Sequence, residues 1–589
     1  MKTILKRFAG IFSLGCMVVF THTSCDNDWL KPEPLSFFSP ENVYTSKSGF
    51  ESLLITMRKD LRLENTGSMN YLVMENASSD LGAPWSQLDF YNLTPNTDVY
   101  YRFLQMFTAV YGSIKNSNVL ITRIDDITWN NESERNAILA EAYWHRAYWY
   151  YRLVNSYGDV PFIGEELKGA KLDFQTHSRW AILEKIKSDL EFAVQWLPAS
   201  AGPGVITKGA GNHLLAKVYL ANLEYAKAEE AATQVINGPY ALMKARFGID
   251  ADKAYRNVIW DLHRPKNFSN PQNRETILAS IDRYEAPAAA RSTGLYTMRH
   301  YNPQITQPQV LDSQGKSGMV ASGPMYDSLG RGNANVRLTH TYQYGIWAYK
   351  GQTWRNTTDL RRSDINWVDV HELRYNNPAS VDYGKPIDVK FLANPVDTFK
   401  HVYAIPHYIM YVPQDDPGAQ PFGGNGDWYI FRLAETYLLR AEARMWQGKN
   451  ADAAADINEV RERAEALPVT AGEIDIDLIL DERARELFAE EPRHSELVRV
   501  SYIMAKEGRN GYSLESFSDK NFYFDRVSRY NNTYAKKIEL LGNVSNMAAF
   551  HALWPIPSNV ITANTMGVIN QNKGYDGAES NLPPLTTIE

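Results

Sequence analysis

The sequence predicts a mainly α-helical protein in which tetratricopeptide-like helical hairpins form a scaffold and a loop-rich middle segment carries a few short β-strands. Apolar residues recur at spacings of three and four in several stretches, as they do in amphipathic helices. Two stretches, Lys208 to Ile236 and Leu433 to Ala464, each contain two such patterns with a very short break between them. Between about Asp250 and Gly426, Gly, Pro, Asn and Asp are dense and helical patterns are short.

The amino terminus has the layout of a secretory signal. Basic residues precede an apolar run from Phe8 to Phe20, and a polar spacer ends before Cys25. A membrane-spanning helix needs about 20 apolar residues, so this run predicts a cleaved signal rather than a permanent span. We expect a signal at residues 1–24, a lipid on Cys25 and a tether at 25–45. Cleavage ahead of Cys16, or ordinary cleavage without lipid, are the alternatives.

The first clear helical pattern starts with a capping signal. Asn131 precedes Glu134 by three residues, and the apolar stripe that follows is stopped by Gly158 and Pro161. A second helical pattern runs over residues 179–197. Trp144 and Trp149 lie within the first of these patterns, and we interpret both as packing residues.

The two hairpin stretches define the rest of the scaffold. Alanines on their facing stripes would let paired helices approach closely, as tetratricopeptide repeats require. Unrelated helix pairs in a generic bundle are the alternative. We therefore divide the mature chain into a helical scaffold at 46–249, a loop-rich ligand-face segment at 250–426, and a helical and capping segment at 427–589.

Composition excludes some classes of function. The chain has 589 residues, 61 basic against 68 acidic residues and a formal charge of -7, without a long basic run. A nucleic-acid partner would require a basic face, so none is expected. Aromatic residues make up 12% of the chain, with 35 Tyr and 14 Trp. We expect some of these rings to face solvent and bind a ligand.

Groups of residues along the chain resemble, in order and spacing, the motifs of SusD/RagB nutrient-binding lipoproteins. They are Asp28-Trp29-Leu30, Arg146-Ala147 with Tyr157-Gly158-Asp159-Val160-Pro161, Thr207-Lys208-Gly209-Ala210, Phe431-Arg432-Leu433-Ala434-Glu435, Glu482-Arg483-Ala484-Arg485-Glu486-Leu487, and Trp554-Pro555-Ile556-Pro557 with Asn570-Gln571-Asn572-Lys573-Gly574-Tyr575. The resemblance covers the chain except its middle third. The family's Glu-Gly-x-Arg motif is replaced by Glu491-Pro492-Arg493-His494-Ser495-Glu496, which leaves the packing of this helix open.

The resemblance implies a lipid-anchored protein of the outer membrane that faces the cell exterior. It implies no catalytic activity and no cofactor. Its expected partners are an oligosaccharide or polysaccharide, a SusC-like TonB-dependent transporter that receives the ligand, and membrane lipid through an acylated Cys25. A peptide-binding member of the family, a purely structural lid on the transporter and a glycoside hydrolase are the alternatives.

Two loop regions offer the residue types that bind sugars, since flat aromatic rings pair with sugar C–H faces and polar groups take the hydroxyls. The first region, partly indicated by the resemblance, contributes Asp80, Trp85, Tyr91 and Asn92. The second contributes Tyr344, Trp347, Trp354 and Arg355. For each aromatic residue taken singly, packing against the core is the alternative.

The sequence contains only incomplete matches to metal-binding and catalytic motifs. His371-Glu372 lacks the second histidine of a zinc-protease helix, and no Gly-x-Ser-x-Gly motif is present. Asp415-Asp416 precedes Pro417 and Gly418 and could bind calcium, but an ordinary turn explains the same residues. We therefore predict neither a metal site nor a catalytic site.

Overall fold

A computed structural model describes residues 43–68, 70–84, 94–96, 102–306, 308–393, 401–535, 539–540, 543–544 and 547–588. Residues 51–589 form one compact unit, and the elements below belong to it except for the first four residues of α3 (Lys47–Asp60). The structure is mainly helical with a few two-stranded sheets, which confirms the predicted fold class.

The long helices lie before and after the middle segment, and the described helices within that segment are all short. The helices of nine or more residues are α3 (Lys47–Asp60), α5 (Arg102–Arg123), α6 (Glu132–Ser156), α7 (Arg179–Trp196), α8 (Lys208–Ala221), α9 (Tyr225–Ile236), α16 (Leu433–Trp446), α17 (Asn450–Arg463), α18 (Ile476–Leu487), α19 (Arg493–Lys506) and α20 (Phe522–Tyr530). The shorter ones are α4 (Tyr71–Ala77), α10 (Val258–Leu262), α11 (Thr297–Tyr301), α12 (Pro324–Leu329), α13 (His340–Gln343), α15 (His407–Met410), α21 (Asn532–Ala535) and α22 (Ser558–Ala563).

The strands form short antiparallel pairs. They are β1 (Gly82–Pro84) with β5 (Val336–Leu338), β2 (Val160–Pro161) with β3 (Thr176–His177), β4 (Thr276–Ser280) with β6 (Trp428–Arg432), and β7 (Glu539–Leu540) with β8 (Asn543–Val544). The β4–β6 pair brings the start and the end of the middle segment (residues 250–426) together. The chain therefore enters and leaves most of the middle segment at the β4–β6 pair.

Helix ends follow the local sequence. The Asn131 side chain accepts a hydrogen bond from the Glu134 backbone N–H, as the capping signal predicts, and Gly158 adopts a φ of 72° just beyond α6. The break between α8 and α9 falls at Asn222–Glu224, where Leu223 has a φ of 62°. Gly448, with a φ of 76°, separates α16 from α17. The predicted hairpins are thus present where the sequence places them.

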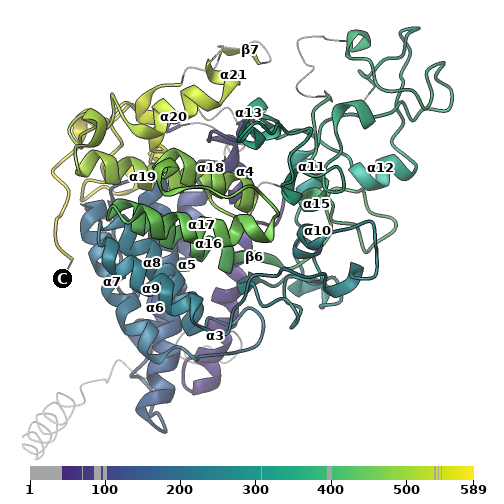
Figure 1. Cartoon of the computed structure of the whole chain (residues 1–589). Helices are drawn as coiled ribbons and strands as arrows, with labels where there is room; N and C mark the ends of the chain where they lie inside the picture. Colours follow the sequence, from purple (N-terminus) through teal and green to yellow (C-terminus); the bar gives the residue numbers. More distant parts are fainter. Residues whose placement is uncertain are drawn as a thin grey trace, which may run out of the picture. The chain divides into compact units, whose positions relative to one another are not determined.

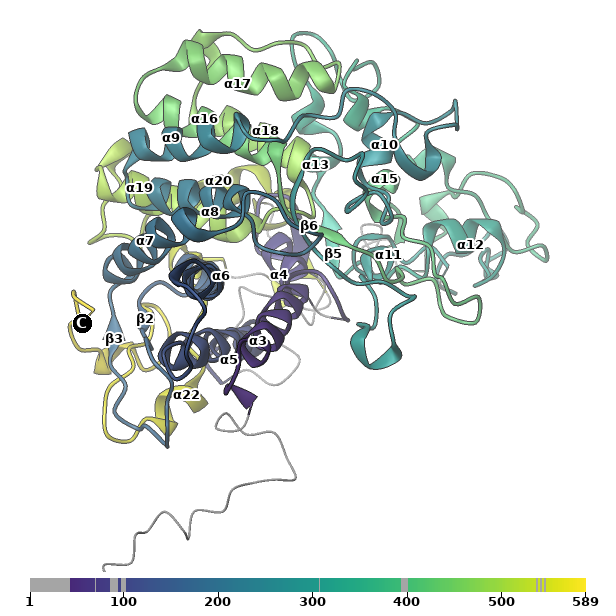
Figure 2. The ribbon, with the colours of Figure 1, turned by 90° about the horizontal axis from the view of Figure 1, so that it is seen from below.

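The helices stack in sequence, and the stack continues across the middle segment. From α5 to α9 each helix packs on the next, and α9 then packs on α16, which starts almost 200 residues later in the chain. Figure 1 shows α9 beside α16, and Figure 2 shows the same neighbours from below. Small residues line this part of the core, because α9 buries Ala228, Ala231 and Ala232. Sequential stacking of this kind is what tetratricopeptide-like repeats require.

Tryptophans of the helices fill the core as predicted. Trp144 and Trp149 of α6 are fully buried, and the Trp144 indole donates a hydrogen bond to the Ala210 carbonyl of α8 at 3.0 Å. Large aromatic side chains of this kind contribute most of the apolar area that one helix buries against its neighbours.

Buried ion pairs join the middle segment to the helices. Arg361 lies in a 3-10 turn, η8 (Leu360–Arg362), and contacts Glu482 at 2.8 Å and Glu486 at 2.9 Å, both on α18. Arg432 of β6 contacts Glu275 at 2.8 Å, Glu490 at 2.8 Å and also Glu486. All these side chains are almost inaccessible to solvent. In Figures 1 and 2 the teal middle segment lies against the α18 side of the helical stack.

The substituted motif at 491–496 packs inside the protein. Arg493 begins α19 and is buried, while Glu496 contacts Lys217 of α8 at 2.9 Å and Arg499 at 2.9 Å. The departure from the family pattern therefore leaves a well-anchored helix.

A candidate ligand-binding cleft in the middle segment

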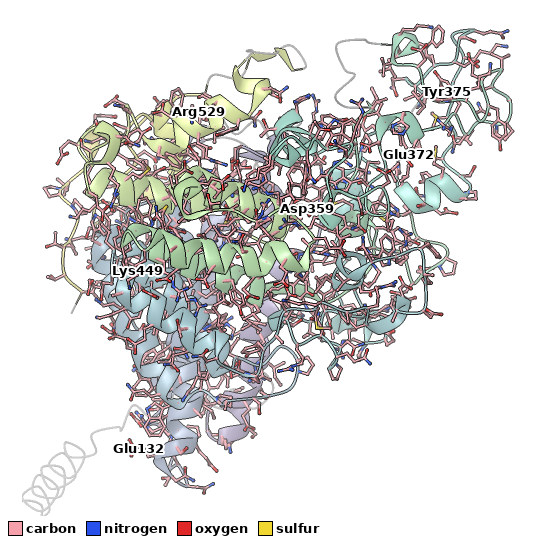
Figure 3. All side chains as sticks on the ribbon, viewed as in Figure 1. Glu132, Asp359, Glu372, Tyr375, Lys449 and Arg529 are labelled. Carbon is pink, nitrogen blue, oxygen red and sulfur yellow. The ribbon has the colours of Figure 1, made fainter. Side chains whose placement is uncertain are left out.

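A cleft with a volume of about 1060 Å³ opens in the middle segment. Four rings line it, together with polar and charged groups. The rings are those of Tyr344, Trp354, Tyr375 and Phe391. The polar and charged groups include His340, Arg355, Asp369, His371, Asp382, Lys385 and Asp388. Figure 3 shows Tyr375 and Glu372 on the loops of this segment, away from the helical stack.

Short turns bring Tyr344 and Trp354 together. The Thr339 backbone donates to the Leu81 carbonyl at 3.0 Å, and the Thr339 hydroxyl caps α13 by accepting from Tyr342 at 3.2 Å. After α13 the chain reverses at Lys350 and Gly351, which both have positive φ. The reversal places the Tyr344 and Trp354 rings 5.0 Å apart at an angle of 49°.

Two guanidinium groups contact the Trp354 ring. The guanidinium carbon of Arg355 lies 4.3 Å from the ring centroid, and that of Arg362 lies 4.9 Å from it. Arg362 is buried and paired with Asp369 at 2.8 Å. Arg355 is exposed, and among the described residues its guanidinium has no hydrogen-bond or carboxylate partner. Contacts between a cation and the face of an indole are favourable and orient both groups.

The carboxylates that line the cleft are each paired with a neighbouring cation. Lys385 contacts Asp382 at 2.8 Å, and Lys390 contacts Asp388 at 2.6 Å. These partners hold the pKa of both carboxyl groups below the ordinary value, with help for Asp382 from hydrogen bonds donated by Ser313. A glycosidase needs a carboxylic acid with a raised pKa, so neither Asp382 nor Asp388 suits that role.

Three of the predicted ligand residues line this cleft: Tyr344, Trp354 and Arg355. Trp347 does not, because its side chain is 2% exposed and its indole N–H donates to the Tyr342 carbonyl at 2.8 Å. Its assignment to the ligand is therefore corrected, since it packs in the core beside Trp367.

Asp80 is also corrected from a ligand residue to a structural one. Its side chain is buried, and Arg493 and Arg526 contact its carboxylate, each at 2.8 Å. Burial alone would raise the pKa of Asp80, but the two arginines hold it well below the ordinary value. Both oxygens of this carboxylate accept hydrogen bonds from arginine.

Other predictions fall outside the described residues. These are the proposed ligand contacts Trp85, Tyr91 and Asn92 and the proposed lipid attachment at Cys25. They remain predictions.

The sequence reasoning missed the second wall of the cleft. Residues 369–391 supply it, and a hairpin-like turn positions them, because the Tyr375 backbone donates to Lys385 at 3.0 Å and Gly384 donates back to Tyr375 at 2.9 Å. The signal available was another mixture of aromatic and polar residues within the same loop-rich segment. Their approach to Trp354 depends on tertiary contacts that no local pattern encodes.

Metal and membrane features are not evident in the described part of the chain. No group of three or more His, Cys, Asp or Glu residues among those described is arranged to hold a metal ion. The Asp416 carboxylate instead accepts a hydrogen bond from the Gly418 backbone at 2.9 Å, in an exposed turn. Within the same residues, every helix is too short or too polar to span a bilayer.

Comparisons with known proteins agree with the resemblance seen in the sequence. Residues 336–575 match the model described as "SusD family", and residues 29–220 match the one described as "Starch-binding associating with outer membrane". The "Starch-binding protein SusD" of Bacteroides thetaiotaomicron is 24% identical over 584 residues, which cover 90% of this chain and 98% of that protein. "SusD-like protein P25" of Formosa agariphila is 22% identical and covers 83% of this chain and 89% of its own length.

Similarity to solved structures extends over nearly the whole chain. A "Laminarin binding SusD-like protein" is 21% identical, covers 90% of this chain and 100% of its own, and superposes with a TM-score of 0.60. "Surface glycan-binding protein A from Bacteroides uniformis" is 18% identical, with coverages of 90% and 99% and a TM-score of 0.60. At these identities the structures establish the fold. The two family models, which together match residues 29–220 and 336–575, show that the chain belongs to the SusD/RagB family of binding proteins.

Proposed function

We propose that this protein binds an oligosaccharide in the cleft of the middle segment and delivers it to a TonB-dependent transporter of the outer membrane. Family membership supports a binding function. The observation that carries the assignment to this site is the convergence of the half-buried rings of Tyr344, Trp354 and Phe391 with polar side chains around about 1060 Å³. That volume is slightly above the roughly 300–1,000 Å³ of typical small-molecule binding sites.

The chemistry of the cleft suits a sugar. Partly exposed ring faces accept the C–H groups of a pyranose, while His340, His371 and Thr353 offer donors and acceptors to its hydroxyls. The cleft lies on the loop-rich middle segment, where Figure 3 shows Glu372 and Tyr375. Membrane association and the transporter partner are inferred from the family.

A peptide is the second candidate ligand. The cleft carries both signs of charge, with Arg355 and Lys385 beside Asp382 and Asp388, and a peptide offers both signs in return. The carboxylates are already paired within the protein, which favours the sugar.

Trp354→Ala tests the proposed site. We expect at least about a tenfold loss of affinity for the glycan that a calorimetric screen of polysaccharides identifies, because this ring lines the cleft and its contact with the Arg355 guanidinium orients that side chain. Trp196→Ala is the matched control, since Trp196 is half-buried on α7 of the helical stack. Equal affinity in both variants would show that the glycan binds elsewhere. Binding of peptides with no response to any glycan would favour the second candidate.

A further inference from the structure

The face of Trp354 is already occupied in the protein, which changes what the cleft presents to a ligand. Arg355 and Arg362 lie over this ring at 4.3 and 4.9 Å, and Tyr344 is tilted against it at 5.0 Å. A neutral sugar that stacked flat on Trp354 would have to displace a guanidinium group. The accessible feature is therefore the edge of the Arg355 guanidinium, with its N–H groups.

A guanidinium that lies over an indole can still bind an anion. The guanidinium N–H groups of Arg355 have no hydrogen-bond partner among the described residues, and their fork matches a carboxylate or a sulfate. Because the stacked side chain is already oriented, less conformational entropy is lost on binding. Arg355 is exposed and has no carboxylate partner among the described residues.

The carboxylates that line the cleft are all paired with cations other than Arg355. Asp369 is paired with Arg362, Asp382 with Lys385 and Asp388 with Lys390. Glu372, on the neighbouring 3-10 turn η9 (Val370–Glu372), accepts a hydrogen bond from the Asp369 backbone at 2.7 Å. His340 and His371 add two imidazoles without carboxylate partners among the residues described.

We propose that the ligand of this cleft is an anionic glycan, one that carries uronic acid carboxylates or sulfate esters, and that Arg355 binds the anionic group. This inference rests on the proposed function and specifies its substrate class. Of the two cations that line the cleft, Arg355 and Lys385, only Lys385 has a carboxylate partner among the described residues. Attraction of a polyanion to such a site would also be weakened by salt.

The test compares glycans that differ only in charge. Oligogalacturonides are titrated against their methyl esters, and sulfated galactan oligosaccharides against their desulfated forms, by calorimetry at low and high salt. We expect one acidic form to bind at least about tenfold more tightly than its neutral counterpart, because a charge-assisted bidentate contact is among the stronger polar interactions. The pair that shows the difference identifies carboxylate or sulfate as the recognised group.

Variants assign the effect to Arg355. Arg355→Gln should lower affinity for the acidic glycan about 10- to 100-fold and leave affinity for the neutral form nearly unchanged. Arg355→Lys should restore part of the loss, since it keeps the charge but not the planar fork. Arg529→Gln removes the same charge from α20, well away from Tyr375 in Figure 3, and should have little effect.

The outcomes separate this inference from the proposed function. If neutral and acidic forms bind equally, or if Arg355→Gln binds the acidic form as the unchanged protein does, the anionic class is wrong and glycan binding stands. If no glycan binds, whether acidic or neutral, the proposed function itself fails.

Discussion

Arginine side chains play two distinct roles in this protein, and burial separates them. Arg493 and Arg526 are buried and neutralise one carboxylate, that of Asp80. Arg355 is exposed and contacts an indole face. Desolvating a charge is costly unless a partner compensates it, so each buried arginine needs its carboxylate, whereas the exposed one keeps its N–H groups free for a ligand.

Asp80→Asn tests the structural role of this carboxylate. The substitution removes the nearest carboxylate of the buried Arg493, while Arg526 keeps Asp477 and Asp481, so we expect a loss of about 3 kcal/mol in the free energy of unfolding. Chemical denaturation followed by circular dichroism measures it. Asp125→Asn is the control, because its carboxylate is 70% exposed in its pair with Arg135 and should contribute less than about 1 kcal/mol. Reduced glycan binding with unchanged stability would instead show that Asp80 contributes to ligand binding.

At the level of elements, the helical scaffold could be predicted because its signals are local. The Asn131 cap, the break near Leu223 and the glycine at position 448 all lie within a few residues of the helix ends that they determine. Apolar spacing then indicates which face of each helix is buried. None of these inferences required knowledge of distant contacts.

The cleft could be predicted only in part, because its walls come from separate stretches of loop. Tyr344, Trp354 and Arg355 stand close together in the sequence, and their loop composition indicated a site. Trp347 lies between them and has the same residue type, yet it points into the core because the short 3-10 turn η7 (Gly345–Trp347) directs it there. Residues 369–391 approach through a separate turn. Such orientation depends on tertiary packing.

At the level of the whole molecule, attachment to the membrane is expected to depend on Cys25. One acyl chain binds a bilayer marginally, whereas several chains, each worth about 0.8 kcal/mol per buried CH₂, anchor a protein stably. Cys25→Ala should therefore release the protein from the membrane fraction in cells that lack the transporter, as measured by fractionation and immunoblotting. Cys16→Ala is the control for the alternative cleavage site. Retention of the Cys25 variant on the membrane would contradict this anchor.

The joint between the middle segment and the helices determines whether the cleft is held rigidly. Glu486 of α18 contacts Arg361 from the middle segment, Arg432 from β6 and Arg463 from α17. Burial alone would raise the pKa of Glu486, but these three arginines hold it well below the ordinary value. One carboxylate thus connects three parts of the chain that are distant in sequence.

Glu486→Gln should weaken the contacts of all three arginines at once rather than a single ion pair. We expect a loss of about 3 kcal/mol or more in unfolding free energy, because three buried cations lose a shared charge. Hydrogen exchange should accelerate together in η8, β6 and α17, since local openings expose cooperative units. Glu473→Gln is the matched control at the same joint: Glu473 accepts a hydrogen bond from Tyr349 at 2.8 Å but is partly exposed, and exchange should stay nearly unchanged. Faster exchange confined to α18, or equal effects of both variants, would show that the buried network does not couple the cleft to the scaffold.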